Sequence, residues 1–241
     1  NLFCTSAERS FGFSPDRIVT CGSALLAAYA QYDPQGTYLL GASFRYDYLW
    51  KLHQEPPRIA TSPVISVLLP YDLRISRFLL LLSAATLQKL MQTGSQVVIK
   101  AHPANKLSDT SALLREAGLI NSPARIAEAS VSDILPVTSV VVSSSSSSAI
   151  EAMCLGIPVV LIGLPVGLDL NMHDLVPSDL WRMAFSEEDI TASISEWALQ
   201  HPLPLSRRRE IGRTILNSFF EPVASGSLSA YVAPATAVAT T

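Results

Sequence analysis

The chain has 241 residues, 49% of them hydrophobic and 15% charged, and its formal net charge is −3 at pH 7. This size allows one large domain or one and a half, with enough apolar side chains for a sizeable core. The net negative charge argues against a protein held to nucleic acid by phosphate contacts, so we expect no nucleic-acid partner.

The N-terminal stretch resembles the end of a domain rather than its start. Residues 5–11 are expected to form the tail of a helix, and residues 17–21 a strand. Since the chain begins with Asn1 and not with Met, we expect an upstream domain to precede it. We therefore assign residues 1–32 to the remnant of an N-terminal domain.

Residues 33–63 are predicted to be an interdomain linker. Within them, the segment "LGASFRYDYLWKL" at 40–52 is aromatic and carries one arginine. Two interpretations stay open: the segment packs between domains, or it forms a surface that meets an acceptor.

From Val64 onward the sequence predicts alternating strands and helices. Strands are expected at 64–69, 96–100, 124–127, 139–142 and 157–162. Helices are expected at 74–91, 109–117, 132–137, 149–155, 186–200 and 205–220. Unbroken apolar strands that alternate with helices predict an α/β fold, a Rossmann-like parallel sheet with helices on both faces. We assign this domain to residues 64–223, and the small, polar residues 224–241 to a flexible tail.

The cysteines and histidines show no metal-binding pattern. Cys4, Cys21 and Cys154 lack metal-ligand spacing, and their odd number is typical of a reducing compartment. The four histidines form no HExxH or similar cluster. No apolar run reaches the roughly 18 residues of a membrane span. We expect a cytoplasmic protein with no metal and no cofactor.

Six consecutive serines, Ser143 to Ser148, stand between the strand at 139–142 and the helix at 149–155. A serine tract is usually a linker, but linkers do not have buried flanks. In a βαβ unit this run lies in the turn after the strand and at the helix start. Helix N-terminal amides and serine hydroxyls bind phosphate. The alternative is that one serine only caps the helix.

A histidine follows the neighbouring strand, in "IKAHPAN". Lys100, His102 and Pro103 lie after strand 96–100, and carboxyl ends of parallel strands share one edge of a sheet. Proline restricts the residue before it, so the imidazole stands on a stiff backbone. Such an imidazole can donate to a phosphate or move a proton. The alternative is a histidine that fills or caps a loop.

The "KAHP" motif, followed about forty residues later by "SSSSSSAIEAMCLGIPVV", resembles GT-B glycosyltransferases of bacterial surface-polysaccharide synthesis. The similarity covers residues 64–200 and is to their C-terminal, donor-binding half. Sialyltransferases, Kdo transferases and CDP-glycerol phosphotransferases share such HP and SS motifs, which hold the donor phosphate. The resemblance places the HP histidine at His102, the serine pair at Ser146 and Ser147, and a ribose contact at Glu151. For Glu151 the alternative is a solvated helix face.

The resemblance implies transfer of a sugar from a CMP- or UDP-linked donor to a cell-surface glycan, without metal. His102 would be catalytic, and cations at Lys100 or Arg74 could assist, although the favoured explanation of Arg74 is a solvent-exposed residue in the first helical turn. Activity would need the upstream domain. The protein would be cytoplasmic, either free or peripheral at the inner membrane face, with polysaccharide-assembly partners. The full set of expected donor-binding residues is Lys100, His102, Pro103, Ser145, Ser146, Ser147, Ser148 and Glu151.

Three alternatives to a transferase stay open. A non-hydrolysing sugar-nucleotide 2-epimerase has the same fold, but it normally carries glycines where this chain has serines. A non-catalytic domain of the same fold could bind a nucleotide or a partner only. An unrelated α/β protein could contain the serine run by chance.

Overall fold

The structure is a computed structural model that describes residues 6–58, 60–144, 146–164 and 175–232. It divides into two compact units. One unit comprises residues 51–215, and the other comprises residues 1–50 together with 216–241. Each unit is described by itself.

The larger unit is built on a six-stranded sheet in which all neighbouring strands are parallel. Its strands are β3 (Val64–Leu68), β4 (Gln96–Lys100), β5 (Arg125–Ile126), β6 (Val140–Ser143), β7 (Val159–Ile162) and β8 (Trp181–Ala184). Their order is β5-β4-β3-β6-β7-β8, which is the 3-2-1-4-5-6 order of a Rossmann fold. The predicted fold class is confirmed.

The centre of the sheet is apolar because its strands are covered on both faces. Every residue of β3, β6 and β7 is buried. Alternate residues of one strand serve opposite faces, so Ile65 and Val67 join one core cluster while Val64 joins another. An unbroken run of valine, isoleucine and leucine is the sequence signature of such a strand.

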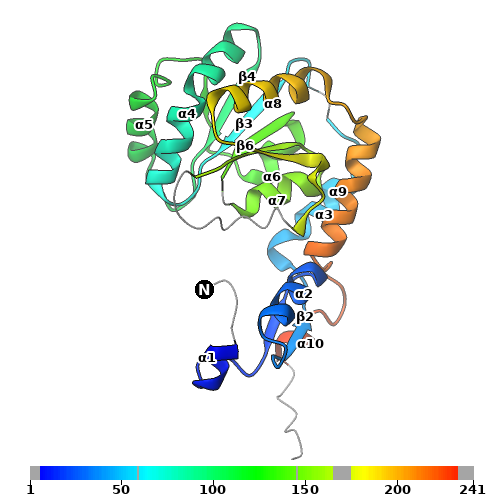
Figure 1. The fold of residues 1–241 in the computed structure, drawn as a ribbon. Coiled ribbons are helices and arrows are strands. Elements are labelled where there is room, and N and C mark those ends of the chain that lie inside the picture. Colours follow the sequence, from blue (N-terminus) through cyan, green and yellow to red (C-terminus); the bar gives the residue numbers. More distant parts are fainter. Residues whose placement is uncertain (1–5, 59, 145, 165–174, 233–241) are drawn as a thin grey trace, which may run out of the picture. The chain divides into compact units, whose positions relative to one another are not determined.

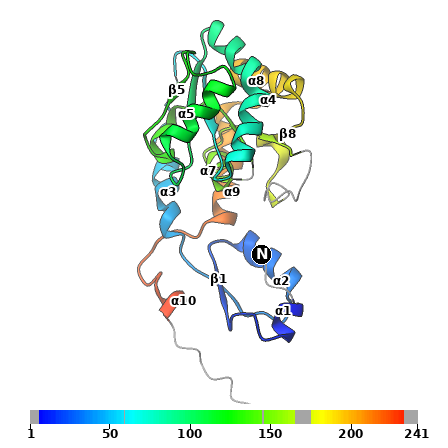
Figure 2. The same cartoon turned by 90° about the vertical axis from the view of Figure 1, so that its left-hand side faces the viewer.

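Helices cover both faces of the sheet (Figures 1 and 2). The helices α4 (Leu73–Gln92), α5 (Leu107–Glu116) and α8 (Glu187–Gln200) contribute buried side chains to the larger cluster. The opposite face carries α6 (Val131–Ile134) and α7 (Ser147–Cys154). These helices match the predicted positions to within a few residues, apart from α6, which continues as a short 3-10 helix, η2 (Leu135–Val137).

Local sequence signals explain where the helices begin and end. The Asp72 side chain accepts a hydrogen bond from the Arg74 amide and caps α4. Ser186 and Asp189 form a reciprocal capping box at the start of α8. Gly156 has a φ of 76° just after α7, a conformation that favours glycine.

Gly156 also permits a close approach of two backbones. The final described helix of this region is α9 (Leu205–Phe219). A Cβ added at Gly156 would lie 2.8 Å from the backbone carbonyl of Arg208, and one added at Gly212 would lie 2.6 Å from the carbonyl oxygen of Cys154. The last turn of α7 therefore packs directly on the backbone of α9.

The smaller unit contains a two-stranded parallel sheet. Its elements are α1 (Ser6–Ser10), β1 (Ile18–Thr20), α2 (Ser23–Tyr32), β2 (Tyr38–Leu40), η1 (Phe44–Tyr46) and α10 (Ser229–Val232), and α3 (Asp47–Gln54) begins in it. The helix tail and strand expected near the N-terminus are present. The helix α2 and the strand β2 were not predicted. Arg9 forms an ion pair of 2.8 Å with the buried Asp33, and this contact lowers the pKa of the Asp33 carboxyl.

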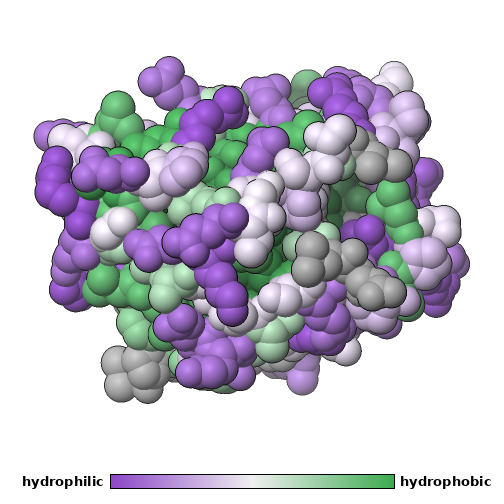
Figure 3. Space-filling model, turned by 90° about the horizontal axis from the view of Figure 1, so that it is seen from above, coloured by the Kyte–Doolittle hydropathy of each residue, from purple (hydrophilic) through white to green (hydrophobic). Residues whose placement is uncertain are grey.

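One face of the molecule has mixed polarity. Hydrophilic and hydrophobic side chains are intermixed on the face shown in Figure 3. Within the described residues, none of the helices combines the length and the hydropathy that crossing a bilayer requires.

Candidate functional site

The chain reverses its direction of winding between β3 and β6. The connection after β3 leads to β4 on one side, whereas β6 lies on the other side and leads to β7. In open α/β sheets, ligands bind outside the carboxyl ends of the strands at such a switch point. Here the hydroxyl of Ser143, the last residue of β6, donates to the carbonyl of Leu68 at 3.0 Å and ties the two strand ends together.

The serine run forms the turn and the helix start that the sequence predicted. Ser143 ends β6, and α7 begins at Ser147. The hydroxyl of Ser146 accepts the amide of Ser148 at 3.2 Å, so Ser146 is the N-cap. The linker interpretation is wrong for the described serines. Ser145 lies outside the described residues.

Capping by Ser146 does not exclude a second use of its hydroxyl. The oxygen accepts the Ser148 amide through a lone pair, and its own proton can still be donated. The side chains of Ser147 and Ser148 are half-buried in the first turn of α7. Three hydroxyls and a helix N-terminus therefore gather at the carboxyl edge of the sheet.

Ser144 is a further candidate that sequence reasoning missed. The residue is only 1% exposed, and its hydroxyl oxygen has no hydrogen-bond partner among the described residues. Such a buried hydroxyl ordinarily has a partner. A ligand at the switch point could supply it. The signal would have been the exact end of β6, which places Ser144 as the first residue beyond the strand.

His102 follows β4 at the same edge of the sheet, because β4 and β6 both run parallel to β3. Its Nδ1 accepts the amide of Ala104 at 3.2 Å, and its carbonyl accepts the amide of Asn105 at 2.9 Å. A ring that accepts through Nδ1 carries its proton on Nε2. The Nε2–H group is therefore the donor that His102 can offer to a ligand.

The loops after β3 and β4 are fastened to each other. The Asn105 side-chain amide donates to the carbonyl of Tyr71 at 3.1 Å and to that of Pro70 at 3.4 Å. The ring of Tyr71 meets the His102 ring edge-on, with 5.5 Å between centroids. These contacts hold the histidine in position next to the switch point, and neither Tyr71 nor Asn105 was among the predicted residues.

The two candidate cations already have partners. Lys100 Nζ donates to the carbonyls of Glu128 at 3.3 Å and Ala127 at 3.5 Å. The Arg74 side chain is 92% exposed and pairs with Asp72 at 2.7 Å. Hydrogen bonds from Arg74 lower the pKa of Asp72 to about 2. The structure favours the interpretation of Arg74 as a solvent-exposed residue.

Glu151 is buried, with 4% of its surface exposed, so the solvated-face alternative is wrong. It lies in α7, whose residues from Ala149 to Cys154 are all buried. Burial, together with the charge of Glu151, raises the pKa of the Cys154 thiol. A role in ribose binding stays a prediction, as do the roles of Pro103 and the other expected site residues. Among the described residues, no cluster of three or more His, Cys, Asp or Glu side chains is arranged to hold a metal ion.

The chain matches no protein-family model and no curated protein sequence. Many solved structures resemble its fold, among them the following three. A variant of the wall teichoic acid polymerase TagF soaked with CDPG has a TM-score of 0.52 at 12% identity, covering 90% of this chain and 56% of that one. A glycosyltransferase from Rickettsia africae ESF-5 has a TM-score of 0.56 at 13% identity, covering 90% and 64%. S. aureus MnaA with UDP has a TM-score of 0.53 at 9% identity, covering 88% and 57%.

The chain thus spans less than two thirds of the length of each of these structures. At these identities the likeness concerns the fold, and it agrees with the predicted GT-B class. The finer resemblance to sialyltransferases and Kdo transferases stays a prediction. The likeness and the serine-lined switch point together lead to the functional proposal below.

Proposed function

We propose that this chain contains the donor-binding domain of a glycosyltransferase, which transfers a sugar from a nucleotide-activated donor to a cell-surface glycan without a metal. One observation carries the proposal. The serine run ends a central strand and begins a helix at the switch point of the sheet, where it leaves the hydroxyl of Ser144 buried without a described partner.

The donor phosphate would bind at the start of α7. Ser146, Ser147 and Ser148 lie at the start of this helix, where the helix N-terminus carries a partial positive charge. The hydroxyl of Ser144, directly after β6, would donate to the same phosphate. His102 would donate its Nε2–H from the loop after β4. All of these donors are uncharged or carry partial charges.

These groups would act on the leaving nucleotide. When the bond between the anomeric carbon and the phosphate oxygen breaks, its electron pair moves onto that oxygen. Donors that are already oriented stabilise the new charge without reorganising. His102 is oriented in this way by the amide of Ala104 and by the loop contact from Asn105. The acceptor hydroxyl would attack the anomeric carbon, and the resemblance places the base that takes its proton in an upstream domain.

The nucleotide would be CMP- or UDP-linked, and the resemblance favours cytidine. The glycan acceptor, a place at the inner face of the membrane and partners in polysaccharide assembly belong to the same proposal. The donor site can be tested without them, because binding of the nucleotide requires only the edge described above.

The test is titration calorimetry of the full chain with CMP and with UDP, in the presence and absence of EDTA. Ser147→Ala and His102→Ala should each weaken binding about ten- to a hundredfold, the loss of one charge-assisted hydrogen bond. Ser108→Ala, at an exposed position in α5, is the matched control and should bind as the wild type does.

Three results would contradict the proposal. Binding that EDTA abolishes would exclude a metal-free site. Equal affinity of the wild type and both site variants would place the nucleotide elsewhere. Nucleotide binding by the full-length protein without any sugar transfer would favour the non-catalytic alternative.

A further inference from the structure

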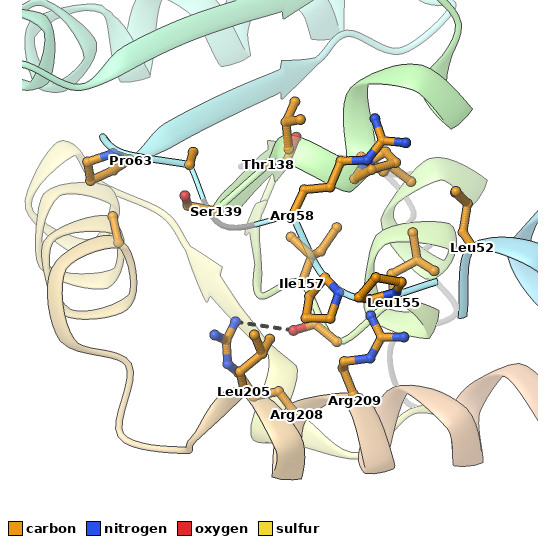
Figure 4. Close-up of a pocket in the computed structure, with 18 of the residues that line it drawn as sticks. Leu52, Arg58, Pro63, Thr138, Ser139, Leu155, Ile157, Leu205, Arg208 and Arg209 are labelled. Atoms are coloured by element: carbon orange, nitrogen blue, oxygen red, sulfur yellow. Dashed lines mark hydrogen bonds between the residues drawn. The ribbon is translucent and has the colours of Figure 1, made fainter. Parts of the chain in front are cut away.

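A cavity of about 280 Å³ lies at the amino ends of the central strands, whereas the proposed donor site lies at their carboxyl ends. Its walls come mainly from the segments that lead into three central strands, residues 55–58 and 60–63 before β3, 135–139 before β6 and 155–157 before β7, with residues 197–198 of α8. The start of α9 closes it with Arg208 and Arg209 (Figure 4). All of these residues belong to the unit of residues 51–215.

This cavity is separate from the proposed donor site. The serines stand at the N-terminal end of α7, and Leu155 to Ile157 follow its C-terminal end. A helix of 8 residues spans about 12 Å, so the whole length of α7 lies between the two places.

Arg208 is the most unusual group in the cavity. Its Nη1 donates to the carbonyl of Gly156 at 3.3 Å, and its Nε is buried without a hydrogen-bond partner among the described residues. No carboxylate of the described residues forms an ion pair with it. Burial lowers the pKa of the guanidinium, because a desolvated charge is unfavourable without a counter-ion.

A second arginine, Arg209, follows it in α9 and also lines the cavity. Arg209 donates through Nη2 to the carbonyls of His53 at 2.5 Å and Glu55 at 3.0 Å. The carboxylate of Glu55 lies 3.6 Å from Arg58, the third arginine of the wall. In Figure 4, Arg208 and Arg209 extend from α9 toward Leu155 and Ile157. Two guanidinium groups are therefore held by carbonyl oxygens, whereas the wall's carboxylate is paired with another arginine.

The rest of the wall carries both apolar residues and polar ones, the latter including Thr138 and Ser139. Proline, leucine, valine and isoleucine side chains face the cavity beside the arginines, among them Pro57, Leu135 and Ile157. A guanidinium binds phosphate through two parallel N–H donors, and two guanidiniums match the double charge of a phosphate monoester. The apolar residues of the wall would contact a short hydrocarbon group.

We propose that this cavity is a second binding site, which takes a phosphate monoester carrying a small apolar group. The phosphate contacts Arg208 and Arg209, and the apolar group lies against Leu135 and Ile157. A volume of about 280 Å³ fits a small ester and is at the lower limit of ordinary ligand pockets. The site does not depend on the proposed donor site.

The experiment is calorimetric titration of the full chain with butyl phosphate and with inorganic phosphate. Butyl phosphate should bind, and inorganic phosphate should bind several-fold more weakly because it lacks the apolar contact. Arg208→Gln and Arg209→Gln should each weaken binding of butyl phosphate about ten- to a hundredfold. Arg207→Gln is the matched control, since Arg207 is exposed, pairs with Glu210 and does not line the cavity.

A variant could lose binding only because it fails to fold, so a second measurement uses the wild-type protein. The NMR signal of the Arg208 Nε–H group, assigned by its loss in Arg208→Gln, should shift when butyl phosphate is added to the wild type. The proposal is overturned if that signal stays in place, if the wild type does not bind butyl phosphate, or if Arg207→Gln and Arg208→Gln weaken binding equally. Inorganic phosphate that binds as tightly as butyl phosphate would also contradict it. Unchanged butyl phosphate binding by Ser147→Ala would support a site distinct from the donor site.

Discussion

The carboxyl edge of the central sheet, where its parallel strands end, and the amino edge, where they begin, offer anions very different surroundings. At the carboxyl edge, the donors are serine hydroxyls, helix amides and one histidine N–H, while the nearby cations Lys100 and Arg74 already have oxygen partners. At the amino edge, Arg208 and Arg209 line a cavity without a carboxylate partner among the described residues.

This difference suggests different tasks. Full positive charges bind an anion tightly in its ground state, before any bond breaks. Neutral donors that are already in place gain more as negative charge develops, which favours the transition state over the bound substrate. The carboxyl edge is therefore suited to a leaving group, and the amino edge to a ligand that is held without reaction.

The helix α7 joins the two edges, and its end at Gly156 gives the largest expected effect. Gly156→Ala should lower the free energy of unfolding by about 2–4 kcal/mol, because a side chain at positive φ is strained and its Cβ would overlap the Arg208 backbone. Gly94→Ala is the control, since Gly94 also has positive φ but has open space around it. It should cost about 1–2 kcal/mol. Urea unfolding of both variants measures the difference, and equal losses would contradict close packing of α7 on α9.

Two neighbouring serines at the carboxyl edge should separate stability from binding. Ser143→Ala removes a buried hydrogen bond to the Leu68 carbonyl and should lower the free energy of unfolding by about 1 kcal/mol, with little effect on nucleotide affinity. Ser144→Ala removes a hydroxyl that has no described partner, so stability should not fall, while nucleotide affinity should drop about tenfold. Unfolding and calorimetry on the pair test this, and the reverse pattern would show that Ser144 is structural.

Asp72 provides the smallest effect, through pH. Its pKa is about 2 in the folded chain and 3.8 ordinarily, so the unfolded chain binds this proton first as the pH falls. The stabilisation is complete above about pH 4 and is lost as the pH falls through about 2. Asp72→Asn should therefore flatten the loss of stability over this interval. Urea midpoints measured along a pH series would show it, and an unchanged acid slope would mean that the pair with Arg74 does not form in solution.

The strands that the sequence pattern specified most directly are those with uniform burial. β3, β6 and β7 are apolar at nearly every position, so their pattern admits few other interpretations. β8 was missed because it is partly exposed and its sequence, Trp-Arg-Met-Ala, is mixed. The alanine-rich α2 was missed although its composition favours a helix.

The candidate sites differ in the same way. The carboxyl edge was predictable because His102 and the serines follow recognisable strands. The burial of Ser144 and Glu151 was not, since it depends on where β6 ends and on how α7 packs. The amino-edge cavity was not predicted, because its walls come from five separate segments of the sequence, which share no local pattern.

The donor site that we propose binds the phosphate of a nucleotide at the start of α7. The most direct measurement is a ¹H–¹⁵N NMR titration of the full chain with CMP in the presence of EDTA. We expect the largest shifts at the amides of Ser146 to Ser148 and at the His102 ring, with none at Gly156 or Arg208. Shifts confined to the amino edge, or unchanged serine amides when the nucleotide is bound, would contradict it.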